Sequence, residues 1–359
     1  MRLLQDFLDQ SKQLNQTPKL EKYPTYQLVN KKYKIIHQGL ILPDLAAPLH
    51  YLNFFSLIGQ PNIPVLANRN AVQTTSLDTA TVICSSSPHM VGQFNHYSIK
   101  KDCHFQHNIF DFSNREVFTG CFPDFQFHRY DEELSVHLRI RTLPLITYFT
   151  KLSFSLAEYW SLACECEGEV SYKGKRYQIK GFGSFEYARS FNLPYLPVCF
   201  FCYQIIHISQ NRQILMTHMR DRFNRIIQSR IYVRDLKNMQ SQMYDQNVRF
   251  KVHRVYPLIK MPNGQSVYLP RELEWNYSDK VGNSINLQVQ SRGDFKFGVG
   301  VGYVGSFSYQ ISINGQVETG ESGYCEYIDC RNLAYQEQDK AEKLLNELAN
   351  SVPIIAKTG

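Results

Sequence analysis

The sequence predicts an all-β protein of two tandem antiparallel β-barrels, with an extended segment before them and a helix after them. Short strand-like runs separated by turn residues fill most of the 359 residues, and helical periodicity is confined to the two ends. Aromatic residues make up 13% of the chain, which favours pleated surfaces and apolar cavities. Many short strands are typical of barrels, and closure removes the unpaired edges of a long sheet.

Four regions follow from these patterns. They are an N-terminal helix with a proline-rich lead-in (1–70), a first barrel (71–190), a second barrel (191–331) and a C-terminal amphipathic helix with its tail (332–359). In the first barrel, residues 134–141 alternate between apolar and polar side chains, as expected of a strand with one buried face. A hairpin is predicted to turn at Gly174, and another at Asn314-Gly315 in the second barrel.

A repeated motif ends both predicted barrels. Each copy has a strand, a glycine turn, a second strand and then Gly-x-x-Glu-Tyr. The two copies lie at a constant offset, so that 183, 186 and 187 correspond to 323, 326 and 327. We therefore predict an internal duplication, with Glu186-Tyr187 and Glu326-Tyr327 in equivalent positions.

This layout resembles the superfamily of AttH and carotenoid 1,2-hydratase (hydroxyneurosporene synthase). The resemblance covers residues 70–330 and rests on the Gly-x-Gly strand that ends the first barrel and the Gly-Tyr-x-Glu-Tyr ending of the second. It implies two lipocalin-like barrels and, for an enzyme, cofactor-independent hydratase, isomerase or cyclase chemistry. The hydratases carry an Asp-His-x-Trp-Gly sequence where this chain has Phe-Glu-Tyr-Ala-Arg at 185–189. The missing His and Trp argue against hydration itself.

Glu186 is the first candidate for catalysis. A carboxylate between Phe185 and Tyr187 could lie in an apolar lumen, where a raised pKa would let it protonate a ligand, supported by Tyr187 and Arg189. The alternative is that Glu186 and Glu326 are structural and pair with neighbours where each barrel closes. The repeat favours this alternative, because a catalytic residue rarely needs a twin.

The functional hypothesis is that the protein binds a lipophilic small molecule, such as a lipid or isoprenoid, in an aromatic cavity. The rival is a non-catalytic structural or protein-interaction double barrel whose interiors are filled. A cavity that touches Glu186 and a histidine would favour the first, and a solid interior the second. The residues expected to line the cavity are His96, His104, His128, Trp160, Trp275, Glu326 and Tyr327.

We expect neither a metal nor a cofactor. His104 and His107 point to opposite faces of a strand, so they cannot share one ion. Residues 300–305 match GxGxxG. The sequence on both sides of them has the alternation of a strand, whereas a dinucleotide site needs a helix after the glycines. Five arginines between 220 and 234 are expected on a solvated outer face, without nucleic acid as a partner.

Location is predicted from cysteines and hydropathy. Nine cysteines have no regular spacing, which favours a reducing compartment and therefore the cytoplasm. The N-terminus does not read as a signal peptide, and no apolar stretch is long enough to span a bilayer. Peripheral membrane contact stays open, and the sequence does not indicate an oligomeric state.

Overall fold

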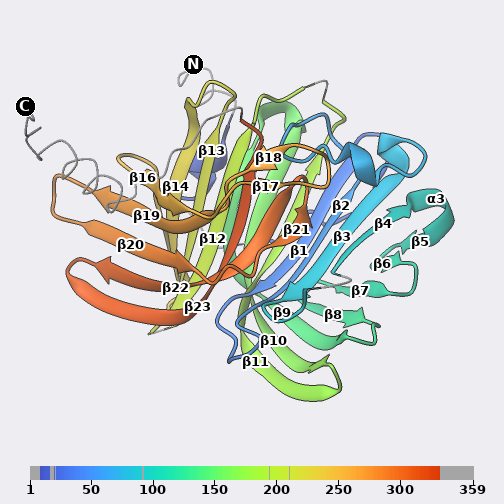
Figure 1. Ribbon diagram of the computed structural model, residues 1–359, viewed down its shortest axis with the longest axis horizontal. Coiled ribbons are helices and arrows are strands. Elements are labelled where there is room, and N and C mark those ends of the chain that lie inside the picture. Colours follow the sequence, from blue (N-terminus) through green and yellow to red (C-terminus); the bar gives the residue numbers. More distant parts are fainter. Residues whose placement is uncertain are drawn as a thin grey trace, which may run out of the picture.

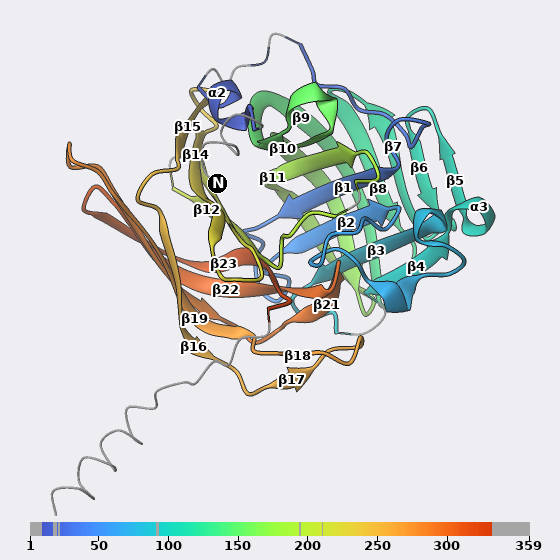
Figure 2. The same cartoon turned by 90° about the horizontal axis from the view of Figure 1, so that it is seen from above.

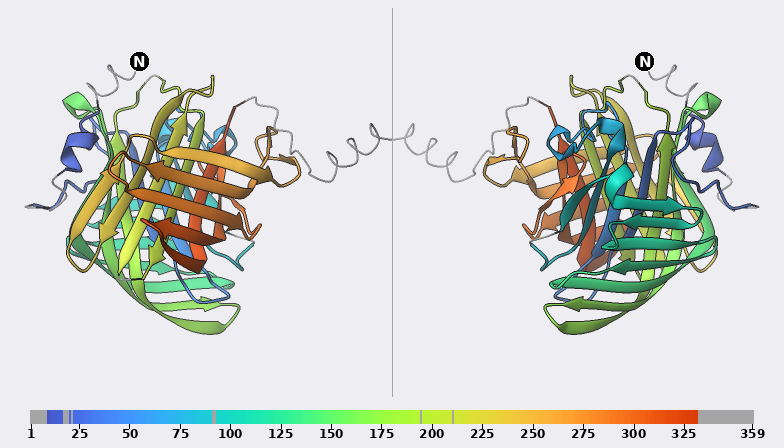
Figure 3. Two further views of the ribbon diagram at one scale, coloured as in Figure 1. Left: turned by 90° about the vertical axis from the view of Figure 1, so that its left-hand side faces the viewer. Right: turned by 90° about the vertical axis from the view of Figure 1, so that its right-hand side faces the viewer.

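The computed structural model describes residues 9–16, 20, 22–90, 93–193, 195–209 and 211–331. It confirms the predicted fold class: two large antiparallel sheets, each strongly curled, pack side by side (Figures 1 and 2). Figure 3 shows the second sheet facing the viewer on the left and the first sheet on the right.

The first sheet has eleven strands in the order β4-β3-β2-β1-β11-β10-β9-β8-β7-β6-β5. Their bounds are β1 Ile35–Leu42, β2 Leu52–Ile58, β3 Thr79–Ser86, β4 Phe94–Ser98, β5 Cys103–Gln106, β6 Ile109–Phe112, β7 Glu116–Cys121, β8 Asp124–Arg129, β9 Leu134–Lys151, β10 Ala157–Tyr172 and β11 Lys175–Ser190. The short helix α3 (Ile99–Asp102) joins the two edge strands, so the sheet curls back on itself.

The second sheet runs β15-β14-β13-β12-β23-β22-β20-β19-β16, and β21 pairs with β22. Its strands are β12 Phe200–Ile208, β13 Arg212–Arg220, β14 Ile226–Asp235, β15 Gln240–Tyr244, β16 Arg249–Val255, β19 Pro270–Ser278, β20 Ser284–Ser291, β21 Lys296–Val299, β22 Gly302–Ile313 and β23 Gln316–Asp329. A separate hairpin of β17 (Ile259–Lys260) and β18 (Ser266–Val267) lies beside it.

Both sheets share one topology. In each, four strands follow one another as a meander, and the last strand returns to pair with the first: β11 with β1, and β23 with β12. The two Gly-x-x-Glu-Tyr motifs lie on these returning strands. The sequence repeat therefore marks equivalent places in the two sheets.

The predicted domain boundary at residue 71 differs from the structure. β1 and β2 fall inside the expected lead-in, yet they are central strands of the first sheet. The prolines led to the wrong boundary. Pro43 and Pro48 lie in the β1–β2 connection, and Pro61 and Pro64 follow β2. They therefore lie between strands and do not interrupt them. All strands of the second sheet lie within 191–331.

The predicted turns have the expected backbone. Lys173 and Gly174 have φ values of 49° and 78°, and Asn314 and Gly315 have 51° and 85°. Positive φ at both central residues is the signature of a tight two-residue hairpin. The alternation in 134–141 is also confirmed, because Leu134, Val136, Leu138 and Ile140 are all buried on β9.

The interior of the first barrel is packed with aromatic side chains. Phe54, Phe118, Phe127 and Phe185 are buried there, together with Trp160. The extended segment that precedes β1 contributes Tyr26, whose ring centroid lies 5.2 Å from that of Tyr187 and 5.4 Å from that of Phe125. The first barrel is therefore filled by its own residues.

The other helices of the described chain are short: α2 (Ser11–Leu14) and the 3₁₀ turns Arg69–Ala71, Ser76–Asp78 and Ser153–Ser155. Among the residues that the structure describes, no helix has the length and apolar character that a membrane crossing requires. The predicted C-terminal helix at 332–359 lies outside the described residues, as do residues 1–8 of the predicted N-terminal helix.

Candidate functional site

Glu186 does not point into the first barrel. On β11, Phe185 and Tyr187 face the barrel interior, and Glu186 between them faces the opposite way, into the interface between the two sheets. The interface contains Tyr203, Tyr324 and Phe149. The expectation of a carboxylate in a lumen is thus corrected by the two-residue period of the strand.

Hydroxyl groups surround the Glu186 carboxylate, which is only 1% exposed. Tyr203 of the second sheet donates to Oε1 at 2.7 Å, Ser184 donates at 3.2 Å, and Tyr159 donates to Oε2. Burial raises the pKa of both Tyr159 and Tyr203, so both hydroxyls stay protonated donors. His37 lies 3.9 Å away through Nε2. These contacts tie one sheet to the other.

Glu326 lies in the same interface on the equivalent strand and is 3% exposed. Tyr324 donates a hydrogen bond to it at 3.0 Å, and Asn53 of the first sheet donates to that tyrosine at 3.1 Å. Burial, and then the charge of Glu186, raise the pKa of Glu326 well above its ordinary value. None of the five main pockets in the described residues is lined by either glutamate, which supports the structural alternative.

Two of the arginines expected on a solvated face are buried instead. Arg234 is 0% exposed, and its guanidinium donates to Thr147 Oγ1 at 2.9 Å and to the Ser161 carbonyl at 2.8 Å. Arg230 donates to Ser11 Oγ at 2.8 Å. The expectation was wrong for these two because the outer face of β14 packs against the first sheet.

Other predicted residues of the first barrel have packing roles. Tyr187 donates from its hydroxyl to the Gln27 carbonyl at 2.9 Å, and its ring packs 5.2 Å from Trp160. Arg189 pairs with Glu158 at 2.7 Å and lies over the Tyr33 ring. Glu186, Tyr187 and Arg189 therefore face different surroundings and do not converge on one cavity.

The three predicted histidines lie apart from one another and from the barrel interior. His96 is exposed on β4, next to Gln73. His104 is exposed on the edge strand β5. His128 lies on the outer face of β8, where its ring is 4.2 Å from that of His137. The structure does not bring them to a common site.

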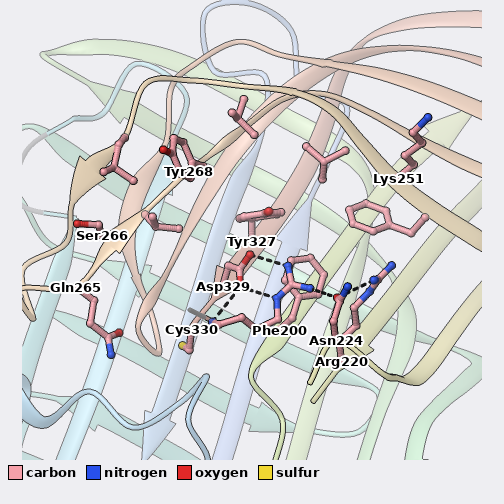
Figure 4. A pocket seen from close by; sticks show the side chains of 16 residues that line it. Phe200, Arg220, Asn224, Lys251, Gln265, Ser266, Tyr268, Tyr327, Asp329 and Cys330 are labelled. Atoms are coloured by element: carbon pink, nitrogen blue, oxygen red, sulfur yellow. Dashed lines mark hydrogen bonds and ion pairs between the residues drawn. The ribbon is translucent and has the colours of Figure 1, made fainter. Parts of the chain in front are cut away.

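A pocket of about 660 Å³ opens at the mouth of the second barrel. One wall is apolar, with Phe200, Phe250, Val252, Val255 and Leu258. Tyr327, a predicted ligand residue, lines this pocket, and Trp275 lies directly behind Phe250 at a ring distance of 4.8 Å. Gln265, Ser266 and Tyr268 border the opposite side, as Figure 4 shows.

The polar end of this pocket is a chain of hydrogen bonds. Arg220 donates to Asn224 Oδ1 at 2.8 Å, and Arg331 donates to the same oxygen. Arg331 also binds Asp329 through two contacts of 2.8 and 2.7 Å. Figure 4 draws these interactions as dashed lines along one side of the pocket.

Sequence reasoning missed most of this pocket. Arg220 was assigned to the solvated arginine group, and Arg331 follows the second Glu-Tyr motif without a motif of its own. The available signal was the spacing Tyr327-x-Asp329-x-Arg331, which places three side chains on one face at a strand end.

A second pocket of about 740 Å³ lies over strands β7 to β11 of the first sheet. Six charged side chains border it, at 124, 139, 141, 165, 167 and 180. Arg139 and Glu167 form an exposed ion pair of 3.1 Å there. Apolar side chains of Phe125, Ile140 and Phe182 lie between these charges, so the lining mixes both kinds of residue.

The glycine run at 300–305 begins in the turn between two strands and continues into β22. Gly300, with a φ of 57°, lies between β21 and β22, and no helix follows. Within the described residues, no group of three or more His, Cys, Asp or Glu side chains is placed to hold a metal ion.

The fold defines a class of protein: two lipocalin-like barrels in tandem, here with a pocket at the mouth of the second barrel. The chain belongs to the family of unknown function DUF6670, whose model matches residues 55–342. Comparison with curated protein sequences finds no match.

One solved structure supports the fold. The chain resembles a provisionally assigned AttH protein from Nitrosomonas europaea with a TM-score of 0.59 and 11% identity, over 87% of this chain and 100% of that one. Kievitone hydratase from Nectria haematococca has a TM-score of 0.48 and 11% identity, with coverages of 83% and 89%. CghA with Sch210972 has a TM-score of 0.47 and 8% identity, with coverages of 88% and 97%. The sequence-based resemblance to the AttH superfamily is confirmed as a likeness of fold.

Proposed function

We propose that the protein binds a lipophilic small molecule, such as a lipid or isoprenoid, in the mouth of the second barrel. The observation that carries this proposal is the pocket of about 660 Å³ with aromatic and aliphatic walls and a polar end. Small-molecule sites commonly combine a concave apolar lining with a few fixed polar groups in this size range. The nine free cysteines support a reducing compartment such as the cytoplasm.

Binding is better supported than proton-driven catalysis by Glu186. That carboxylate is buried between the sheets, and its oxygens are already occupied by hydroxyl donors. The rival function, a structural or interaction role, is favoured for the first barrel alone, because aromatic side chains fill its interior. The two barrels would then differ in role: the first a packed support, the second a binding module.

Native mass spectrometry of the purified protein, combined with lipid extraction and a thermal-shift panel, tests the proposal. A co-purifying lipophile, or a rise in melting temperature with one, is expected for the wild-type protein. Val252→Trp, which fills the pocket, should abolish both the co-purification and the rise in melting temperature. Val281→Trp, in an exposed loop outside the pocket, should leave both unchanged. If no bound lipophile is detected and no compound of the panel raises the melting temperature, the binding proposal is wrong and the structural role is favoured.

A further inference from the structure

The charges that line the second-barrel pocket are unbalanced. Arg220, Lys251 and Arg331 are cationic, and Asp329 is the one carboxylate among the lining residues. An excess of positive charge is not expected in a pocket for a purely apolar ligand, because an unpaired charge near apolar walls loses solvation free energy. The excess therefore requires an explanation.

Asp329 is already committed to Arg331. Its two oxygens accept from Nε at 2.8 Å and from Nη2 at 2.7 Å, which is the bidentate geometry preferred by a guanidinium and a carboxylate. The Arg331 side chain is only 10% exposed and lies over the Phe200 ring. This pair uses both Asp329 oxygens, so Arg220 forms no ion pair of its own, and the Asp329 charge acts on it only at longer range.

Arg220 binds only neutral groups. Its Nε donates to His218 Nε2 at 2.6 Å and its Nη1 donates to Asn224 Oδ1 at 2.8 Å. Burial, and then the charges of Arg220 and Arg331, lower the pKa of His218 to about 3, so the ring is neutral and accepts at Nε2. Within the described residues, no carboxylate lies at ion-pair distance from Arg220. Burial and the charge of Arg331 lower the pKa of this half-buried guanidinium.

His218 and Asn224 thus hold Arg220 in place without neutralising it. His218 is itself fixed, because its Nδ1 lies 3.0 Å from Ser229 Oγ. A guanidinium that is oriented, half-buried and still charged is the arrangement used to recognise an oxyanion.

We propose that the ligand of this pocket is an amphipathic anion, whose carboxylate or phosphate head group is bound by Arg220 while its apolar part lies against Phe250 and Val252. This inference rests on the proposed function and adds the chemical class of the ligand. Lys251 lies at the rim but is exposed between Phe250 and Val252 on β16 and opposite Glu274, so the head group is assigned to Arg220 alone. Figure 4 shows Arg220 and Asn224 together at one end of the pocket.

The test is calorimetric titration of the full chain with dodecanoate, dodecyl phosphate and dodecan-1-ol, below their aggregation limits. The wild-type protein should bind at least one anion about tenfold or more tightly than the alcohol, as expected for charge-assisted hydrogen bonds. Arg220→Gln should lose that preference and keep its affinity for the alcohol. Arg222→Gln removes the same charge from an exposed neighbour outside the pocket lining and should keep the preference.

The outcomes separate the two proposals. Failure of all three ligands to bind the wild-type protein would overturn the proposed function. Equal binding of the alcohol and both anions, or an equal loss of preference in both variants, would overturn the anionic head group and leave the binding pocket standing. The wild-type comparison needs no variant, so the inference stays testable if Arg220→Gln fails to fold.

Discussion

Replacing Glu326 by Gln should make the protein more stable at neutral pH. The carboxyl is buried between the two sheets, accepts a hydrogen bond from Tyr324, and faces the charge of Glu186. Its pKa is raised above the ordinary value of 4.5, so the folded state keeps a proton that the unfolded state releases. Stability contributed by this proton is present at pH 4.5 and falls as pH rises toward the folded-state pKa.

The magnitude follows from linkage. One proton difference between the two states changes the free energy of unfolding by about 1.4 kcal/mol per pH unit inside the affected window. Glutamine mimics the protonated acid, so the variant does not lose stability as the pH rises through this window. The stability difference between Glu326→Gln and the wild type should be small near pH 4.5 and grow with pH.

Equilibrium unfolding in urea, repeated between pH 4.5 and pH 8, measures this difference. Glu132→Gln, at an exposed surface position, is the matched control and should give a difference near zero at every pH. A Glu326→Gln protein that is less stable than the wild type at pH 7, or whose difference does not change with pH, would refute the reasoning about the buried carboxyl.

Three further perturbations test the packing. Tyr203→Phe removes the 2.7 Å hydrogen bond to Glu186 and should lower the free energy of unfolding by about 1.5–3 kcal/mol, whereas Tyr130→Phe, at an exposed site, should change it little in the same urea titration. Trp160→Ala should cost about 3–5 kcal/mol by opening a cavity in the filled first barrel; a loss below 1 kcal/mol by denaturant unfolding would contradict the filled interior. Burial lowers the pKa of Lys296 from 10.5 to about 8, so wild-type stability should rise between those pH values, by roughly 3 kcal/mol at most, and Lys296→Met should not show that rise.

Much of the fold could be predicted from local sequence. Period-2 alternation in 134–141 and the Lys173-Gly174 and Asn314-Gly315 turns depend only on neighbouring residues, and all three have the predicted geometry. The resemblance between the two ends also pointed to equivalent strands. Such features are encoded within a few residues and need no knowledge of long-range contacts.

The site was harder to predict because its geometry is set by contacts between distant segments. Sequence alone does not reveal which face of β11 meets the second sheet, and that choice decides whether Glu186 lies in a lumen or an interface. Likewise, Arg220 and Arg331 are separated by more than a hundred residues and meet only because β12 pairs with both β13 and β23. Burial of Arg234 has the same origin, since it depends on the first sheet covering β14.

The polar interface gives the two barrels a fixed arrangement. Tyr203 reaches from the second sheet to Glu186, and Gln213 donates from the second sheet to the Gly183 carbonyl at 3.1 Å. Buried polar groups of this kind are satisfied only in one relative placement of the sheets. The interface thereby fixes the two barrels relative to each other.

Photo-crosslinking with a diazirine-labelled fatty acid, followed by peptide mass spectrometry, tests the central claim most directly. Labels should map to the mouth of the second barrel, on Phe250, Val252, Tyr268 or Tyr327, and excess unlabelled dodecanoate should compete them away. Labels that fall on the first barrel, or that resist competition, would contradict a ligand site in the second barrel.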